Sequence, residues 1–168
     1  MTARKVMLLG EIGVGKTSLV RRLVDGRFDG QYQPTLGADV YTYDVPETRL
    51  QPPVTLILWD TDGNFGESIF THIYIREAAA ALVVGDVTRA DTLRAMAGLG
   101  RGFLNARPGR HLGFILNKLD LVVGPEPCHI GTIAATLEAP VARTSAKTGS
   151  NVLDVFHETA ATIVRRGL

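Results

Sequence analysis

Short apolar runs alternate with longer amphipathic segments along this 168-residue chain. The runs at 83–84 and 114–116 lie in stretches with almost no polar positions, which is typical of strands buried on both faces of a parallel sheet. The longer segments repeat their apolar residues every three or four positions, as helices do. The pattern predicts strands over 5–10, 38–45, 55–60, 80–86, 112–117 and 141–144, and helices over 16–25, 66–77, 91–106, 129–137 and 152–166.

Strands that alternate with helices predict an α/β fold, in which right-handed crossovers cover both faces of an open sheet. Ligands of such sheets bind beyond the carboxyl ends of the strands. The chemistry should therefore lie just after residues 10, 60, 86, 117 and 144. The length, with no internal repeat and no long linker, predicts a single domain over 1–168.

The segment 10–17 reads GEIGVGKT and matches the pattern G-x-x-x-x-G-K-[ST] in full. It lies between a predicted strand and a predicted helix, the context that this pattern requires. Glycines let the backbone N–H groups wrap a phosphate chain, and the helix points its positive end at the anion. A nucleoside triphosphate is the predicted ligand, with Lys16 on its β- and γ-phosphates and the Thr17 hydroxyl on Mg²⁺. A plain glycine-rich turn with a surface lysine is the alternative. The residues of this predicted cradle are Gly13, Val14, Gly15, Lys16, Thr17 and Ser18.

The segment ILNKLD, at 115–120, follows another predicted strand and contains Asn117, Lys118 and Asp120 in the N-K-x-D spacing of guanine-binding proteins. A carboxylate at Asp120 can accept hydrogen bonds from the ring N–H and the amino group of guanine. Adenine has no such donor pair, so the carboxylate would be left unpaired at a cost in affinity. The stem of Lys118 can cover one face of the base. The segment therefore predicts a guanine nucleotide.

A second segment, TSAKTG at 144–149, follows the last predicted strand. Its Ser145, Ala146 and Lys147 match the second guanine-side loop of GTPases, where the backbone N–H of Ala146 would meet the base carbonyl. Alone, N-K-x-D is short enough to recur as a helix cap or loop. Two independent motifs at two expected strand ends make chance a poor explanation.

With these motifs, the chain resembles a small GTPase of the Ras superfamily over essentially its whole length. The segments PTLGAD, at 34–39, and LWDTDG, at 58–63, are most similar to the Rab branch, as are Tyr74 and Arg76. The resemblance implies a P-loop NTPase fold of the small GTPase type, with a six-stranded, mostly parallel sheet and about five helices. An alanine- and arginine-rich composition would suit a prokaryotic member.

The resemblance also implies roles for residues outside these motifs. Phe28 would pack against the guanine, the alternative being an ordinary apolar contact at a helix end. Tyr32 and Thr35 match the first switch, in which the threonine binds Mg²⁺ and senses the γ-phosphate. Asp60 would hold Mg²⁺ through water, and the backbone N–H of Gly63 would sense the γ-phosphate. The implied metal residues are Thr17, Thr35 and Asp60, and ordering and release of the loops near 28–39 and 60–76 would be the switch.

Three positions depart from the family pattern and bear on hydrolysis. Asn64 replaces the glutamine that positions water and is one methylene shorter, and a misplacement of about 1 Å can cost on the order of a hundredfold in rate. Asp62 replaces an alanine and places a carboxylate near the γ-phosphate and the metal. Ile12 replaces a small P-loop residue and would crowd the attacking water. Unless the loops have repacked around them, these residues predict slow intrinsic hydrolysis, with Lys16, Thr35, Gly63 and Asn64 as the catalytic set.

Two function classes follow from these residues. The first is a slow GTPase that cycles between GTP and GDP and meets effectors, GTPase-activating proteins and exchange proteins through its switch regions. The second is a GTP-bound scaffold or binding module with little or no hydrolysis. An ATP-using P-loop kinase lacks support because both base motifs indicate guanine.

Composition limits the kinds of ligand, metal site and cellular location that the chain can have. The formal net charge of +1 argues against a general nucleic-acid binder. Cys128 is the only cysteine, so an intramolecular disulfide and a cysteine-cluster metal site are excluded, and the four histidines show no metal-binding spacing. The N-terminal apolar run at 6–9 is too short for a signal peptide or a membrane span. The end of the sequence carries no prenylation cysteine. These features predict a cytoplasmic protein without a lipid anchor, monomeric by default.

Overall fold

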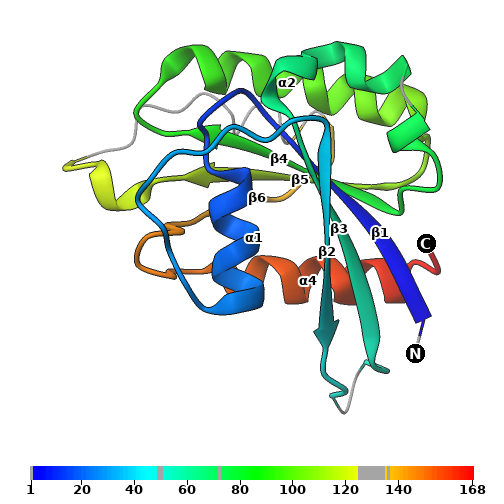
Figure 1. Ribbon diagram of the computed structural model, residues 1–168. Helices are drawn as coiled ribbons and strands as arrows, with labels where there is room; N and C mark the ends of the chain where they lie inside the picture. Colours follow the sequence, from blue (N-terminus) through cyan, green and yellow to red (C-terminus); the bar gives the residue numbers. More distant parts are fainter. Residues whose placement is uncertain (1, 49–50, 72, 125–134, 136) are drawn as a thin grey trace.

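The structure is a computed structural model that describes residues 2–48, 51–71, 73–124, 135 and 137–168. Within these residues six strands form one twisted sheet in the order β2-β3-β1-β4-β5-β6 (Figure 1). Only β2 is antiparallel to its neighbour, so the expected six-stranded, mostly parallel sheet is confirmed. The strands are β1 (Thr2–Leu9), β2 (Ala38–Val45), β3 (Val54–Thr61), β4 (Ala80–Asp86), β5 (His111–Asn117) and β6 (Val141–Arg143).

The sheet is covered on both faces. Helices α1 (Lys16–Asp25) and α4 (Val152–Arg165) pack on one face, and α2 (Ala90–Ala106) packs on the other (Figure 1). Alternate residues of β1 supply the two core layers, because successive strand side chains point to opposite faces. Val6 and Leu8 join the α1–α4 layer, whereas Met7 and Leu9 join the α2 layer. Every residue of β4 and β5 is buried, as their apolar pattern predicts.

One expectation about the helices is wrong, and another falls almost wholly on residues that the structure does not describe. The segment predicted as a helix over 66–77 forms two 3₁₀ segments instead, η1 (Gly63–Thr71) and η2 (Ile73–Ile75). Gly66, at φ +48° and ψ −135°, interrupts the first, and no α-helical ladder can run through that conformation. The helix predicted over 129–137 lies almost wholly outside the described residues. The described part therefore holds three α-helices rather than about five.

The carboxyl ends of the parallel strands meet at one edge of the sheet, where the loops after β1, β3, β4, β5 and β6 gather. This is the edge at which open α/β sheets bind ligands. No helix within the described ranges has both the length and the apolar character needed to span a bilayer.

Candidate functional site

A cavity of about 250 Å³ lies at this edge, between α1, the segment 28–35 and the loops that follow the strands. It brings together most of the residues that the sequence singles out. Val14, Asp60 and Ser145 do not line it, since they are buried behind the lining and hydrogen-bond to residues that do. The predicted residues that line the cavity are Gly13, Gly15, Lys16, Thr17, Ser18, Phe28, Tyr32, Thr35, Gly63, Asn64, Asn117, Lys118, Asp120, Ala146 and Lys147.

The loop from β1 to α1 curls around the Lys16 side chain. Its Nζ donates to the backbone oxygens of Gly10 at 2.7 Å and Glu11 at 3.1 Å, so the ammonium sits inside the loop. Gly13 and Gly15 have φ values of +74° and +101°, which only glycine adopts without strain. The loop therefore has the bare, left-handed backbone and the central cation that a phosphate cradle requires.

Burial lowers the pKa of Lys16 from 10.5 to about 8, and the carboxylates of Asp60, Asp62 and Glu11 offset part of that effect. Lys16 is 6% exposed, so its charged form has lost most of its hydration. An anion in the cavity would restore the charged form. The lysine is thus mostly charged at pH 7, and it must take up a proton on phosphate binding only above about pH 8.

This pKa predicts how nucleotide affinity depends on pH. Below about pH 8 the nucleotide-free protein already carries the Lys16 proton, whereas above it binding must include proton uptake. Affinity for GDP should therefore fall about tenfold between pH 7 and pH 9, because one proton is linked to binding. Titration of GDP across this range measures the change, and calorimetry in two buffers of different ionisation enthalpy measures the proton uptake. Guanosine, which lacks the phosphates, should show no such dependence. An affinity for GDP that is constant from pH 7 to pH 9 would contradict the prediction.

Three oxygen-bearing side chains meet beside this lysine. The Thr17 hydroxyl donates to Asp60 Oδ2 at 2.5 Å and lies 3.1 Å from the Thr35 hydroxyl. Asp60 is fully buried, and burial is the main reason why its pKa is raised. Its other oxygen, Oδ1, is buried without a hydrogen-bond partner among the described residues.

A buried, unpaired carboxylate oxygen next to two hydroxyls suits a hard cation that prefers oxygen ligands. The residues present therefore fit Mg²⁺, the metal that the family implies. Elsewhere in the described part of the chain, no group of three or more His, Cys, Asp or Glu side chains is placed to hold a metal ion.

Asn117, at the end of β5, ties three loops together. Its Nδ2 donates to the backbone oxygen of Val14 at 3.0 Å. Its Oδ1 accepts from the Thr144 hydroxyl at 3.0 Å and from the Ala146 N–H at 3.2 Å. The asparagine is 1% exposed, so all of these bonds are shielded from water. The phosphate loop and the two predicted base loops are one connected unit.

The base loops carry further ordered charges. Asp120 accepts a hydrogen bond from Ser145 Oγ at 2.5 Å. Lys118 Nζ donates to the Gly13 oxygen at 2.7 Å and pairs with Asp86 Oδ2 at 2.6 Å. Burial acts to raise the pKa of Asp86, but hydrogen bonds from Lys118 and Thr88 outweigh it and the pKa is lowered. The ammonium of Lys118 is thus held between the phosphate loop and the end of β4.

Comparison with known proteins agrees with this geometry. A family model described as the Ras family matches residues 5–165. The chain belongs to the Ras family. It is 34% identical over 164 residues to Ras-related protein Rab5A of Oryza sativa subsp. japonica, an alignment that covers 96% of this chain and 80% of the rice protein. It is 36% identical over 166 residues to Ras-related protein RABG3e of Arabidopsis thaliana, covering 92% and 79% of the two chains. Ras-related protein Rab7 of Pisum sativum is 33% identical over 177 residues, covering 99% and 84%. The expected likeness to the Rab branch is confirmed, and the chain is a Rab-like small GTPase.

Within this family the three unusual residues take definite places. Ile12 is 40% exposed and lines the cavity, while its backbone oxygen accepts a hydrogen bond from Arg89 Nη1 at 2.7 Å. Asp62 also lines the cavity, and its Oδ1 accepts from the backbone N–H of Asn64 at 2.8 Å. The carboxylate of Asp62 thus fixes the start of the segment that carries Asn64.

Several positions that line the cavity or contact its loops are not apparent from sequence motifs. Asp86, the partner of Lys118, ends β4, one of the strand ends where ligand chemistry is expected, and this is the signal that could have identified it. Arg22 binds the backbone oxygens of Ala146 and Lys147 at 2.8 and 2.5 Å, a contact across the fold that no motif marks. Arg21 lines the cavity, and its only signal is its place one helical turn after Thr17.

Proposed function

We propose that this Ras-family chain is a guanine-nucleotide switch that binds GTP and GDP with Mg²⁺ and hydrolyses GTP slowly. The observation that carries this proposal is the single cavity where the phosphate loop, the Thr17–Thr35–Asp60 corner and the base loops meet. A site that lacked any one of the three would favour another ligand. The hydrogen bonds of Asn117 connect the phosphate loop to the base loops, which supports a ligand that carries both a base and phosphates.

The chain's own groups would share the work of hydrolysis. Lys16 and the backbone N–H groups of its loop would bind the phosphate oxygens and stabilise negative charge as the bond to the terminal phosphate breaks. Thr17, Thr35 and Asp60 would hold Mg²⁺, which when bound neutralises charge on the β- and γ-phosphates. Asn64 would orient the attacking water. Positioning and electrostatics supply most of the effect in this type of reaction.

The two switch segments are already connected in the structure. The backbone N–H of Asp62 donates to the Gly37 oxygen at 2.8 Å, which joins the segment 28–39 to the segment 60–76. Gly63 lies so close to the phosphate loop that an added Cβ would be 2.4 Å from the Ile12 nitrogen. A γ-phosphate held near Thr35 and Gly63 would therefore order both segments together, which supports a cooperative switch.

Hydrolysis should be slow because Asn64 is short, and restoring the missing methylene tests this. Asn64→Gln is expected to raise the single-turnover rate of phosphate release roughly tenfold to a hundredfold, the cost that about 1 Å of misplacement carries. Protein preloaded with GTP and Mg²⁺ is followed by phosphate release for both forms. Asn105→Gln, the same substitution at an exposed position of α2 away from the cavity, serves as the control. A variant no faster than the wild type would show that side-chain length at position 64 does not limit the rate.

A second candidate function, a GTP-bound scaffold with little or no hydrolysis, is favoured by two residues of the cavity. Ile12 and Asp62 both line the cavity, where one would crowd the attacking water and the other would repel the terminal phosphate. A GTP-bound scaffold would leave GTP intact over many hours in both the wild type and Asn64→Gln. The same measurement therefore separates the timed switch from the scaffold.

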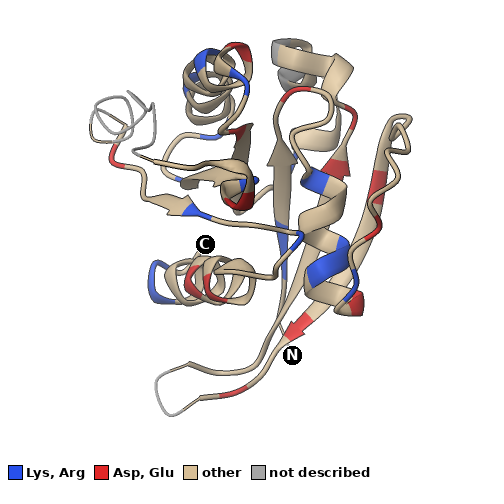
Figure 2. Cartoon of the chain, turned by 90° about the vertical axis from the view of Figure 1, so that its left-hand side faces the viewer, with Lys and Arg blue, Asp and Glu red and all other residues tan. Residues whose placement is uncertain are grey.

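The partners proposed for either function are proteins. Large apolar side chains are exposed on and beside the switch segments, among them Tyr32, Leu36, Val40 and Ile73. Exposed apolar groups of this kind mark protein-binding surfaces. Acidic and basic residues are interspersed along the chain (Figure 2). That mixture favours effectors and regulators over nucleic acid.

A further inference from the structure

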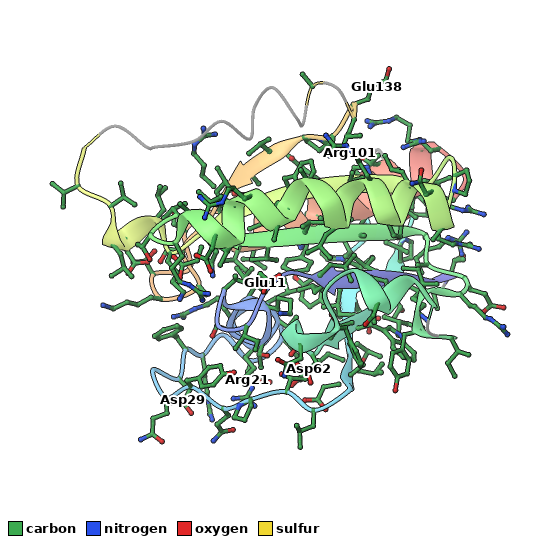
Figure 3. All side chains as sticks on the ribbon, turned by 90° about the horizontal axis from the view of Figure 1, so that it is seen from above. Glu11, Arg21, Asp29, Asp62, Arg101 and Glu138 are labelled. Atoms are coloured by element: carbon green, nitrogen blue, oxygen red, sulfur yellow. The ribbon has the colours of Figure 1, made fainter. Side chains whose placement is uncertain are left out.

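Arg21 is the cation that the family pattern and the mechanism above leave unexplained. It lies on α1 four residues after Thr17, so both side chains share one face of the helix. It is half-buried and lines the cavity together with Tyr32, Pro34 and Thr35; Figure 3 labels its side chain. Side chains on a helix lean toward its N-terminus, and four residues rise only about 6 Å. An extended arginine can therefore reach back toward the phosphate end of the cavity.

The guanidinium of Arg21 has no hydrogen-bond or ion-pair partner among the described residues. Its neighbour Arg22, by contrast, donates to the Ala146, Lys147 and Gly26 oxygens. Lys16 and Lys118, the other buried or half-buried cations of the cavity, also have acceptors. A half-buried guanidinium without an acceptor has lost part of its hydration without a hydrogen bond to compensate. The missing partner should be an anion that enters the cavity.

Carboxylates are near but do not supply that anion. Asp29 and Asp62 line the same cavity and lie on either side of Arg21 (Figure 3). Asp29 accepts from the Gln31 N–H at 2.9 Å and Asp62 accepts from the Asn64 N–H, so each carboxylate is held by its own loop. Neither forms an ion pair with Arg21. Arg21 thus lines the cavity without a carboxylate partner among the described residues.

We propose that Arg21 is a catalytic arginine supplied in cis, whose guanidinium contacts the terminal phosphate of GTP during hydrolysis. The inference rests on the proposed function. The oxygen of water bonds to the γ-phosphorus while the bond to the β–γ bridging oxygen breaks. The electron pair of that bond stays on the bridging oxygen, which becomes a terminal oxygen of GDP, and both protons of the water leave with the released phosphate as H₂PO₄⁻. Arg21 stabilises the charge that builds on these oxygens. It would thereby replace part of what the short Asn64 lacks.

The test compares Arg21→Gln and Arg21→Lys with the wild type, and Arg101→Gln serves as the matched control. Arg101 is exposed on α2, on the opposite face of the sheet (Figure 3). Three quantities are measured: single-turnover phosphate release, affinities for GDP and a non-hydrolysable GTP analogue, and retention of aluminium fluoride by the GDP-bound protein. Aluminium fluoride bound beside GDP carries the charge and shape of the phosphoryl group in transfer, so its retention reports the extra cation without turnover.

Arg21→Gln is expected to lower phosphate release at least tenfold, since arginines that contact the terminal phosphate in related GTPases supply about 10³–10⁵-fold when provided by a partner. It should also abolish retention of aluminium fluoride, while affinity for GDP stays within about twofold. Arg21→Lys should be intermediate, because it keeps the charge but loses the planar fork. Arg101→Gln should match the wild type.

Two results would overturn the inference and leave the GTPase function intact. One is wild-type hydrolysis and fluoride retention in Arg21→Gln. The other is an equal loss of affinity for GDP and for the GTP analogue, which would show that Arg21 only supports the fold of the cavity. Failure of the wild type to bind guanine nucleotides would instead refute the proposed function, and this inference with it.

Discussion

Replacing Asp120 with asparagine is expected to lower the affinity for GDP by at least about 10³-fold and to allow a xanthine nucleotide to bind. The carboxylate is proposed to accept two hydrogen bonds from guanine, one from the ring N–H and one from the amino group. In asparagine the NH₂ group would face one of these guanine donors, and that hydrogen bond would be lost. Sites built around such polar contacts reject a mismatched ligand by about 10⁴–10⁵-fold. Xanthine carries a carbonyl where guanine carries its amino group. The asparagine NH₂ can donate to that carbonyl while its oxygen accepts from the ring N–H.

This substitution should leave the fold intact, which makes it a sharp test. Asparagine keeps an Oδ1 that can still accept from Ser145 Oγ, the hydrogen bond that Asp120 makes in the structure. Equilibrium titration with GDP and with xanthosine diphosphate measures the change in specificity. Asp154→Asn, an exposed position in the first turn of α4, removes the same charge and should change neither affinity. Unchanged affinity for GDP in Asp120→Asn would show that another group reads the base.

The strands and helices that sequence predicts best are those in which local pattern and tertiary burial agree. The boundaries of β2, β4 and α1 match the predicted 38–45, 80–86 and 16–25 to the residue. The strand β4 is buried along its whole length, and α1 begins at a motif lysine and ends before Gly26, at φ +66°. The segment 66–77 shows the opposite case. Its apolar spacing suits an α-helix, but Gly66 and the packing of Ile69 and Ile75 under α2 produce 3₁₀ turns.

The candidate site likewise combines features that sequence predicts with features that it does not. The glycines, Lys16 and the two base motifs are contiguous in sequence, so their chemistry can be identified from spacing alone. The contacts that assemble them are not contiguous, since Asn117 meets Val14 across 103 positions and Arg22 meets Ala146 across 124. The pairing of Lys118 with Asp86 and the unpaired guanidinium of Arg21 also depend on how helices and strands pack. Sequence thus predicts the individual motifs, whereas the contacts between them can be identified only from the fold.

Adding a single methyl group at Gly15 should disable the whole site. An alanine Cβ there would lie 2.4 Å from Asn117 Nδ2, and the backbone at φ +101° is strained for any residue with a Cβ. Asn117 cannot simply move aside, because Thr144 and Ala146 hold its oxygen. Gly15→Ala should therefore lower the affinity for GDP at least about a hundredfold. It should also reduce the free energy of unfolding by about 2–5 kcal/mol, from backbone strain of about 1–2 kcal/mol and broken buried hydrogen bonds of about 1–3 kcal/mol.

Gly26→Ala separates strain from the loss of these contacts. Gly26 also has a positive φ, +66°, but an added Cβ would meet nothing within 4 Å. Its cost should be about 1–2 kcal/mol, with the affinity for GDP unchanged. Urea unfolding and GDP titration of both variants give the comparison. If Gly15→Ala lost no more stability or affinity than Gly26→Ala, the hydrogen bonds of Asn117 would not be what connects the phosphate loop to the base loops. If Gly15→Ala lost more stability and more affinity than Gly26→Ala, binding of the base and binding of the phosphates would both depend on the buried amide of Asn117. A change in the contacts to the base would then alter the contacts to the phosphates, and the reverse.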